Sequence, residues 1–343
     1  MTDAPGVLAL PAAAAAGGTD AVPEAADSAA EALTGTASGT VTGTAGETLA
    51  AHLAAHAGSF LRGLPAIDPR TLRRVAGALH TFDALLDPAW ARELHDELTR
   101  LGTLLGQELA YTRRLARLTA ALDTLACVDA EAAPGAPKAR ALLERQLTLA
   151  RSRAHSLALQ ELGSARFHAV ADKMTLLVSD LPLRGTAGDG PATALLPPAT
   201  SARLRLTEAV AALPLQRTAR PYNGEALHES GEDLPWRQVR LLALRARYAL
   251  EVCAPLLGPA TGGASAGLAE LARLLGQHQE ATDAAGAAAL AGATPRITPA
   301  TAYVLGVVHA DQRLEVEAAR HAFSLAWPDI HHPDWLSDTW LTH

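Results

Sequence analysis

The chain has 343 residues, of which 49% are hydrophobic and only 4% aromatic, and its formal net charge is −7. The length allows one large domain or two of ordinary size. No run of about 18 apolar residues free of charges and helix breakers occurs, which excludes a transmembrane helix. The two cysteines, Cys127 and Cys253, lack the Cys-x-x-Cys spacing of metal and redox motifs. We interpret both as buried thiols and expect a reducing, cytoplasmic location.

The negative charge is concentrated near the start of the chain. Residues 1–61 hold six acidic residues and no lysine or arginine, so the remainder carries 29 basic against 36 − 6 = 30 acidic residues. This balance argues against general nucleic-acid binding but allows a local basic groove. Only Lys138 and Lys173 are lysines, and arginine suits bidentate contact with phosphate or carboxylate. A GC-rich genome would favour arginine in the same way, so this bias alone does not establish an anion-binding function.

Residues 1–45 are rich in Ala, Gly, Thr and acidic residues, and we predict that they are disordered because they lack core-forming side chains. Residues 6–16 resemble the apolar part of a signal peptide, but no positive residue precedes them, which argues against secretion. Asp68-Pro69 and Asp87-Pro88 are typical helix starts, because Asp can cap the first amides and Pro fits the first turn. Helical patterning begins near Gly46, and helices are predicted over 68–86, 87–124, 138–160 and 164–180, with a break at 132–137.

The Gly- and Pro-rich segment 181–198 is predicted to link a first half, about 46–180, to a second half, about 199–327. Residues 328–343 are predicted to form an irregular tail. In the second half we expect helices over 199–213, 235–257, 264–291 and 298–326, with a polar loop over 214–235. Because Ala and Leu dominate these stretches, the predicted fold is all-α.

Residues 70–107 and 240–277 resemble two copies of one sequence. Ala78-Leu79 recurs 171 residues later as Ala249-Leu250, and the LxxLLGQ block that ends at Gln107 recurs 170 residues later. The near-constant offset predicts a duplicated helical unit. Two related halves usually pack about a pseudo-twofold axis, and the face they share is a natural groove.

Each copy contains a helix with arginines on one side. These basic residues are Arg70, Arg73, Arg74 and His80 in the first copy, and Arg237, Arg240 and Arg247 in the second. Arg245 projects instead from the apolar side, where a guanidinium must meet a carboxylate, reach a groove or contact a bound anion. Arginine stripes are most often solvated faces or internal ion pairs, and this interpretation stays open.

The second copy carries a family resemblance. Residues 233–257, DLPWRQVRLLALRARYALEVCAPLL, and the following LLGQHQE at 274–280 resemble the second half of a CHAD domain (conserved histidine α-helical domain). The first copy, the central segment 151–181 and residues 303–327 are also similar to this family, so the resemblance covers about residues 46–327. It implies two pseudo-symmetric helical bundles around a basic central groove that binds inorganic polyphosphate. It also implies no catalysis by the domain itself. We expect no cofactor.

The signatures of this family are only partly present. Arg240, Arg245, Arg247 and Tyr248 fall on basic and aromatic positions of the second signature, whereas Arg237 stands where it has its histidine. The first signature is more eroded: Arg73 and Arg74 match its arginine pair, Ala66 stands at its histidine, and Leu109-Ala110 occupy its later Arg-Asp pair. Both histidines that give the family its name are therefore missing. The chain is either a divergent member with weaker phosphate binding or one that kept the fold and lost the ligand.

We predict non-catalytic binding of inorganic polyphosphate, or a similar polyanion, in the central groove. His80 and His278 would strengthen binding below about pH 6.5. The predicted binding residues are Arg73, Arg74, His80, Arg166, Lys173, Arg237, Arg240, Arg245, Arg247 and His278. The alternative is a structural or protein-interaction scaffold that has lost its anion site. An enzyme is a distant third possibility, because nucleotide-binding loops, nucleophile elbows and the Glu-x-Glu-x-Lys motif are absent. We expect no metal site, since His52 and His56 have helical spacing but no third ligand nearby, and no membrane or nucleic-acid partner.

Overall fold

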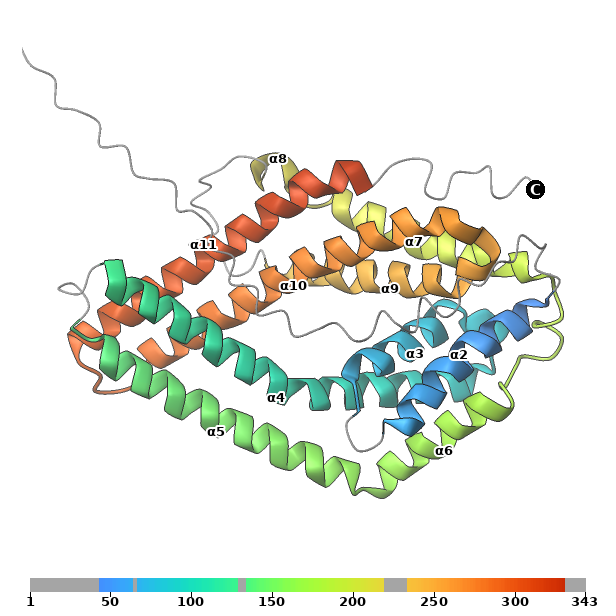
Figure 1. The fold of residues 1–343 in the computed structure, drawn as a ribbon, viewed down its shortest axis with the longest axis horizontal. Helices are drawn as coiled ribbons and strands as arrows, with labels where there is room; N and C mark the ends of the chain where they lie inside the picture. Colours follow the sequence, from blue (N-terminus) through green and yellow to red (C-terminus); the bar gives the residue numbers. More distant parts are fainter. Residues whose placement is uncertain (1–42, 64–66, 129–133, 219–232, 331–343) are drawn as a thin grey trace, which may run out of the picture. The chain divides into compact units, whose positions relative to one another are not determined.

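The computed structural model describes residues 43–63, 67–128, 134–218 and 233–330, and its regular structure there is helical (Figure 1). Extended pairing within these ranges is limited to two isolated bridges, Thr44 with Pro191 and Leu86 with Leu183. The predicted all-α fold is confirmed. No helix in these ranges combines the length and apolar composition that a bilayer crossing needs.

The first half begins at α2, where Thr44 and Glu47 form a reciprocal capping box that satisfies two otherwise unpaired amides. Asp68 caps α3 through the backbone amide of Arg70, and Asp87 accepts hydrogen bonds from the first amides of α4. The elements of this half are α2 Ala45–Arg62, α3 Pro69–Thr81, η1 Asp83–Leu85, α4 Pro88–Val128, α5 Ala136–Leu162 and α6 Ala165–Ser179.

The second half, like the first, contains long helices. Its elements are η2 Ala192–Leu195, α7 Leu196–Ala211, α8 Leu215–Thr218, α9 Asp233–Leu257, η5 Gly258–Ala260, α10 Thr261–Gly292 and α11 Pro299–Ile330. The first sequence copy forms α3 and the first part of α4, and the second copy forms most of α9 and the first part of α10. In both copies the two helices pack on each other, and α3 also packs on α9. The pseudo-twofold relation between the halves stays a prediction.

Two hydrophobic cores lie along the long helices α4 and α10. The main core includes Leu101 of α4 and Leu275 of α10, and the second core includes Leu118 and Ala284 of the same two helices. Between these positions both helices pass from one core to the other. His278 and Ala281 of α10 are buried there, whereas Arg113 of α4 and Glu280 of α10 are exposed and line the space between α3, α4, α9 and α10.

Several predicted boundaries differ from the structure. The predicted linker 181–198 ends early, because α7 begins at Leu196 and Pro197 and Pro198 occupy its first turn, where a missing N–H breaks no hydrogen bond. The helix predicted to reach Leu86 ends at Thr81, and a short 3-10 turn follows.

The two predicted tails also need correction at their inner ends. Ala45, assigned to the disordered segment 1–45, is buried as the first residue of α2. Residues 328–330, assigned to the irregular tail 328–343, belong to the last turn of α11. The predictions for residues 1–42 and 331–343, and for most of the polar loop 214–235, lie outside the described residues.

Candidate functional site

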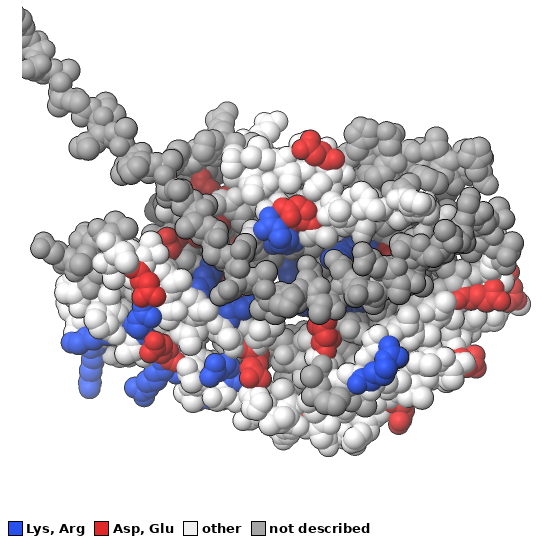
Figure 2. All heavy atoms as spheres, viewed as in Figure 1, with Lys and Arg blue, Asp and Glu red and all other residues white. Residues whose placement is uncertain are grey.

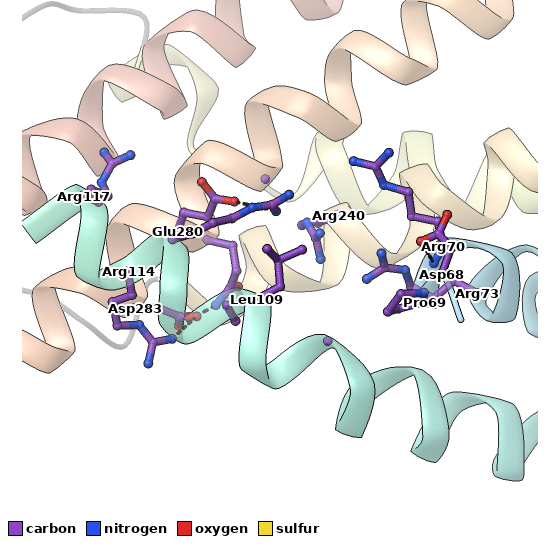
Figure 3. Close-up of a pocket in the computed structure, with 15 residues that line it drawn as sticks. Asp68, Pro69, Arg70, Arg73, Leu109, Arg114, Arg117, Arg240, Glu280 and Asp283 are labelled. Atoms are coloured by element: carbon purple, nitrogen blue, oxygen red, sulfur yellow. Dashed lines mark hydrogen bonds and ion pairs between the residues drawn. The ribbon is translucent and has the colours of Figure 1, made fainter. Parts of the chain in front are cut away.

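A pocket of about 210 Å³ lies between α3, α4, α9 and α10, in the space between the two cores (Figure 3). We call it the arginine pocket, because six arginines from three helices line it together with three carboxylates. Its lining residues are Asp68, Pro69, Arg70, Arg73, Gly106, Leu109, Ala110, Arg113, Arg114, Arg117, Arg240, Gly276, Gln279, Glu280 and Asp283. The formal charge of these side chains is +6 − 3 = +3. A hollow with this excess of guanidinium groups is suited to an anion that offers several negative charges.

Arg240 and Arg73 form the most basic part of the pocket. Arg240 Nε is buried and has no hydrogen-bond partner among the described residues. Burial lowers the pKa of Arg240, and the neighbouring positive charge of Arg73 lowers it further. Arg240 is thus partly buried beside the like charge of the exposed Arg73, while the negative charges of Glu280 and Asp283 partly offset this repulsion.

The α4 arginines are closer to electrical balance, because α10 supplies carboxylates. Arg113 Nη1 lies 3.3 Å from Glu280 Oε1, and Arg114 Nη2 lies 2.9 Å from Asp283 Oδ2. Arg117 turns toward α11, where it contacts Gln312 and lies 3.2 Å from Glu315 Oε2. The space-filling view shows basic and acidic side chains interspersed on the coloured part of the face presented (Figure 2).

The structure brings only some of the predicted binding residues to this pocket. Arg73 and Arg240 line it, and Arg237 reaches its edge, with Nη2 3.6 Å from Asp283 Oδ1. Arg74 and Arg247 lie elsewhere on α3 and α9, where both contact Glu251 at 3.1 Å. These two were expected to face the groove, but a shared internal carboxylate holds them.

Arg166 and Lys173 of α6 are also placed away from the pocket. Arg166 Nη2 lies 2.6 Å from Glu97 Oε1, and Lys173 Nζ lies 2.6 Å from Glu93 Oε1, so both pair with the first turns of α4. They were predicted to bind the ligand in the groove, but they do not line the pocket. They join α6 to α4 at the surface.

Arg245 and His80 form a separate basic group and do not line the pocket. The His80 ring lies 5.4 Å from the ring of His95. Burial lowers the pKa of His80, and the charge of Arg245 adds to this effect. Burial also lowers the pKa of Arg245, followed by the charge of Arg205 on α7. Among the three alternatives for Arg245, the structure shows no contact with a carboxylate of the described residues.

His278 is an interior residue, which corrects its predicted role in the groove. Only 2% of it is exposed, its ring stacks on Trp236 at 5.6 Å, and Nε2 accepts a hydrogen bond from Arg320. Burial, and then the charges of Arg320 and Arg313, lower its pKa to about 3. It is therefore neutral near pH 6.5 and cannot strengthen anion binding there. A pattern signal existed, because His278 continues the apolar stripe of Leu271, Leu274 and Leu275.

Four lining arginines were absent from the predicted set: Arg70, Arg113, Arg114 and Arg117. The last three lie on α4 beyond the end of the first sequence copy, so the repeat does not include them. Arg117 follows Arg113 and Arg114 by four and three positions, a helical spacing that is a signal that could have found them. Leu109 and Ala110, where the family pattern has an Arg-Asp pair, line the same pocket as apolar residues. Within the described ranges, no group of three or more His, Cys, Asp or Glu residues could hold a metal ion.

Comparison with known proteins places these features in a family. The CHAD domain family model matches residues 70–289. The solved structure of PptA from Streptomyces chartreusis is 46% identical, covers 83% of this chain and 99% of its own, and superimposes with a TM-score of 0.71. A crystal structure of the CHAD domain from the plant Ricinus communis is 23% identical, covers 84% of this chain and 95% of its own, and has a TM-score of 0.47. No curated protein matches the chain. Since the family model spans more than half of its length, the chain belongs to the CHAD domain family.

Proposed function

We propose that the protein binds inorganic polyphosphate, or a closely similar polyanion, in the arginine pocket. The observation that carries the proposal is the convergence of six guanidinium groups on one hollow that contains three carboxylates. Membership in the CHAD domain family supports the same ligand class. Arginine forks match phosphate oxygens in bidentate geometry, and each charge-assisted hydrogen bond contributes about 1.5–3 kcal/mol.

We propose binding without catalysis. Apart from its arginines and carboxylates, the described lining consists of Gly, Ala, Leu, Pro and Gln, with no His, Cys, Ser, Thr or Tyr that could act as nucleophile or proton carrier. Two of the three carboxylates are engaged by arginines. The purified protein should release no phosphate from polyphosphate. Measured release would contradict this part of the proposal.

The binding test compares two double variants by calorimetry with long-chain inorganic polyphosphate. Arg73→Gln with Arg240→Gln should weaken binding about tenfold or more, since losing even one charged hydrogen bond costs about a factor of ten. Arg145→Gln with Arg153→Gln removes two exposed arginines of α5, a helix that does not line the pocket, and should leave affinity nearly unchanged. Raising the salt concentration should weaken wild-type binding steeply. Absence of wild-type binding at low salt would contradict the proposal.

A scaffold without an anion site is the second candidate. The observation that favours it is the internal pairing of arginines that were expected to face a groove, above all Arg74 and Arg247 with Glu251. If this candidate holds, polyphosphate gives no calorimetric signal at any salt concentration. The arginines would then stabilise contacts between helices instead.

A further inference from the structure

Two carboxylates of α10 already occupy guanidinium groups of the arginine pocket. Glu280 engages Arg113 at 3.3 Å, and Asp283 engages Arg114 at 2.9 Å; Figure 3 labels the second pair. The two acidic residues are three positions apart, so they share the face of α10 that lines the pocket. The hydrogen-bond donors that these oxygens use are donors that phosphate oxygens would also need.

We propose that Glu280 and Asp283 are internal competitors that limit the affinity of this pocket for polyanions. The inference rests on the proposed function. A polyanion that enters must displace these carboxylates from Arg113 and Arg114 or lie beside them, and like charges in a partly buried space repel. The carboxylates thus select ligands whose charge density exceeds their own, which a chain of linked phosphates provides.

The two carboxylates differ in how firmly they are held. Asp283 also accepts a hydrogen bond from Gln279 at 2.8 Å and lies 3.6 Å from Arg237, so it has three neighbours to lose. Among the described residues, Glu280 forms one ion pair, with Arg113, and 45% of its side chain is exposed. Glu280 is therefore the carboxylate that a ligand moves aside more readily.

A purely structural role, in which the ion pairs hold α4 against α10, explains them less well than competition with a ligand does. On either side of the pocket, α4 and α10 are held by the two hydrophobic cores, through Leu101 and Leu275 on one side and Leu118 and Ala284 on the other. An exposed ion pair such as Arg113–Glu280 adds little to such packing. Carboxylates that face a cluster of arginines in a hollow have a larger effect on what enters the hollow.

The experiment measures the affinity for long-chain inorganic polyphosphate of Glu280→Gln, Asp283→Asn and the double variant at two salt concentrations. We expect the double variant to bind about tenfold more tightly, equivalent to removing roughly one strong charge interaction. Its affinity should also fall more steeply with salt, because more arginines replace counterions on the ligand. The matched control is Glu270→Gln, which removes one charge from the same helix at a carboxylate that pairs with Arg273 and does not line the pocket.

The outcomes separate this inference from the proposed function. Tighter binding by the double variant than by the wild type, with the Glu270 control unchanged, supports the inference. If the wild type binds and the double variant binds equally or more weakly, the carboxylates position the arginines, and the inference is overturned while the proposed function stands. If the wild type does not bind at low salt, the proposed function fails and the inference with it. Should the double variant not fold, the partly exposed Glu280→Gln alone must show the gain.

Discussion

Gly77 on α3 lies directly against the ring of Tyr248 on α9: a Cβ atom at position 77 would fall 2.6 Å from Tyr248 Cδ2. Side chains do not tolerate such an approach, and the Tyr248 ring is buried and cannot swing away. The missing side chain therefore allows close contact between α3 and α9. These are the helices that bring Arg73 and Arg240 to one pocket.

Gly77→Ala should therefore destabilise the protein. Within a helix, replacing Gly by Ala usually stabilises by about 0.5–1 kcal/mol, but forced overpacking costs about 1–3 kcal/mol, so the sign is diagnostic. The matched control is Gly286→Ala on α10, where a Cβ meets nothing within 4 Å and the usual gain is expected. Urea denaturation measures both. Equal stabilisation by the two substitutions would show that the helices can separate without cost.

Asp233→Asn should destabilise the protein strongly. The Asp233 carboxylate accepts hydrogen bonds from Arg313 Nη1 at 2.8 Å and Arg320 Nη2 at 2.7 Å, and only 3% of each of the three residues is exposed. Removing the negative charge leaves two buried guanidinium groups without it, which costs about 3 kcal/mol or more. Glu315→Gln, which alters a pair with a 56% exposed carboxylate, should change stability by less than about 1 kcal/mol. Similar losses from both variants in chemical denaturation would contradict this account.

The stability of the protein should fall as the pH is lowered from 6.5 toward 4.5. Burial, His56 and Arg74 lower the pKa of His52 to about 3, against 6.5 for an ordinary histidine. Between these values the unfolded chain binds a proton that the folded chain does not, so unfolding is favoured by up to about 1.4 kcal/mol per pH unit for each such histidine. The effect is absent above pH 6.5 and complete below about pH 3. His52→Leu should reduce the dependence of the unfolding free energy on pH between 6.5 and 4.5, measured by denaturation. An unchanged dependence would show that other groups cause it.

Arginines inside and outside the pocket should contribute differently to polyphosphate binding. Arg74→Gln with Arg247→Gln removes two guanidinium groups that share Glu251, and we expect affinity to fall less than about threefold, because these groups are already paired. The corresponding change at Arg73 and Arg240 should cost about tenfold or more. Calorimetry compares the affinities of the two double variants for polyphosphate, and each variant has lost two positive charges. A larger loss from the Arg74 and Arg247 pair would place the ligand against Glu251 instead.

The two cysteines should react at very different rates. Cys253 is fully buried in α9, and burial raises the pKa of its thiol to about 12, so almost no thiolate forms at pH 8. Cys127, near the end of α4, is exposed. A thiol reagent such as Ellman's should modify one cysteine of the native protein rapidly, and Cys127→Ser should abolish this phase. Rapid labelling that survives this substitution would show that α9 opens. The sequence prediction that both thiols are buried is wrong for Cys127.

Local patterns in the sequence determined the helices of this protein. The Asp-Pro starts at residues 68 and 87 are real helix starts, and the two sequence copies each form a pair of packed helices. The choice of Arg73 and Arg240 as pocket residues also followed from helical spacing and the family resemblance. These features depend on interactions among residues a few positions apart, which a sequence displays directly.

Only the tertiary structure decided which neighbour each helix face meets. Arg74 pairs with Glu251, 177 positions away, and Arg114 pairs with Asp283, 169 positions away. Helical periodicity orients a side chain about its own axis, but whether that side faces a carboxylate, an aromatic ring or a pocket depends on how distant helices pack. For this reason His278, predicted to bind the ligand, is buried against Trp236, and Arg113, which was not predicted as a binding residue, lines the pocket.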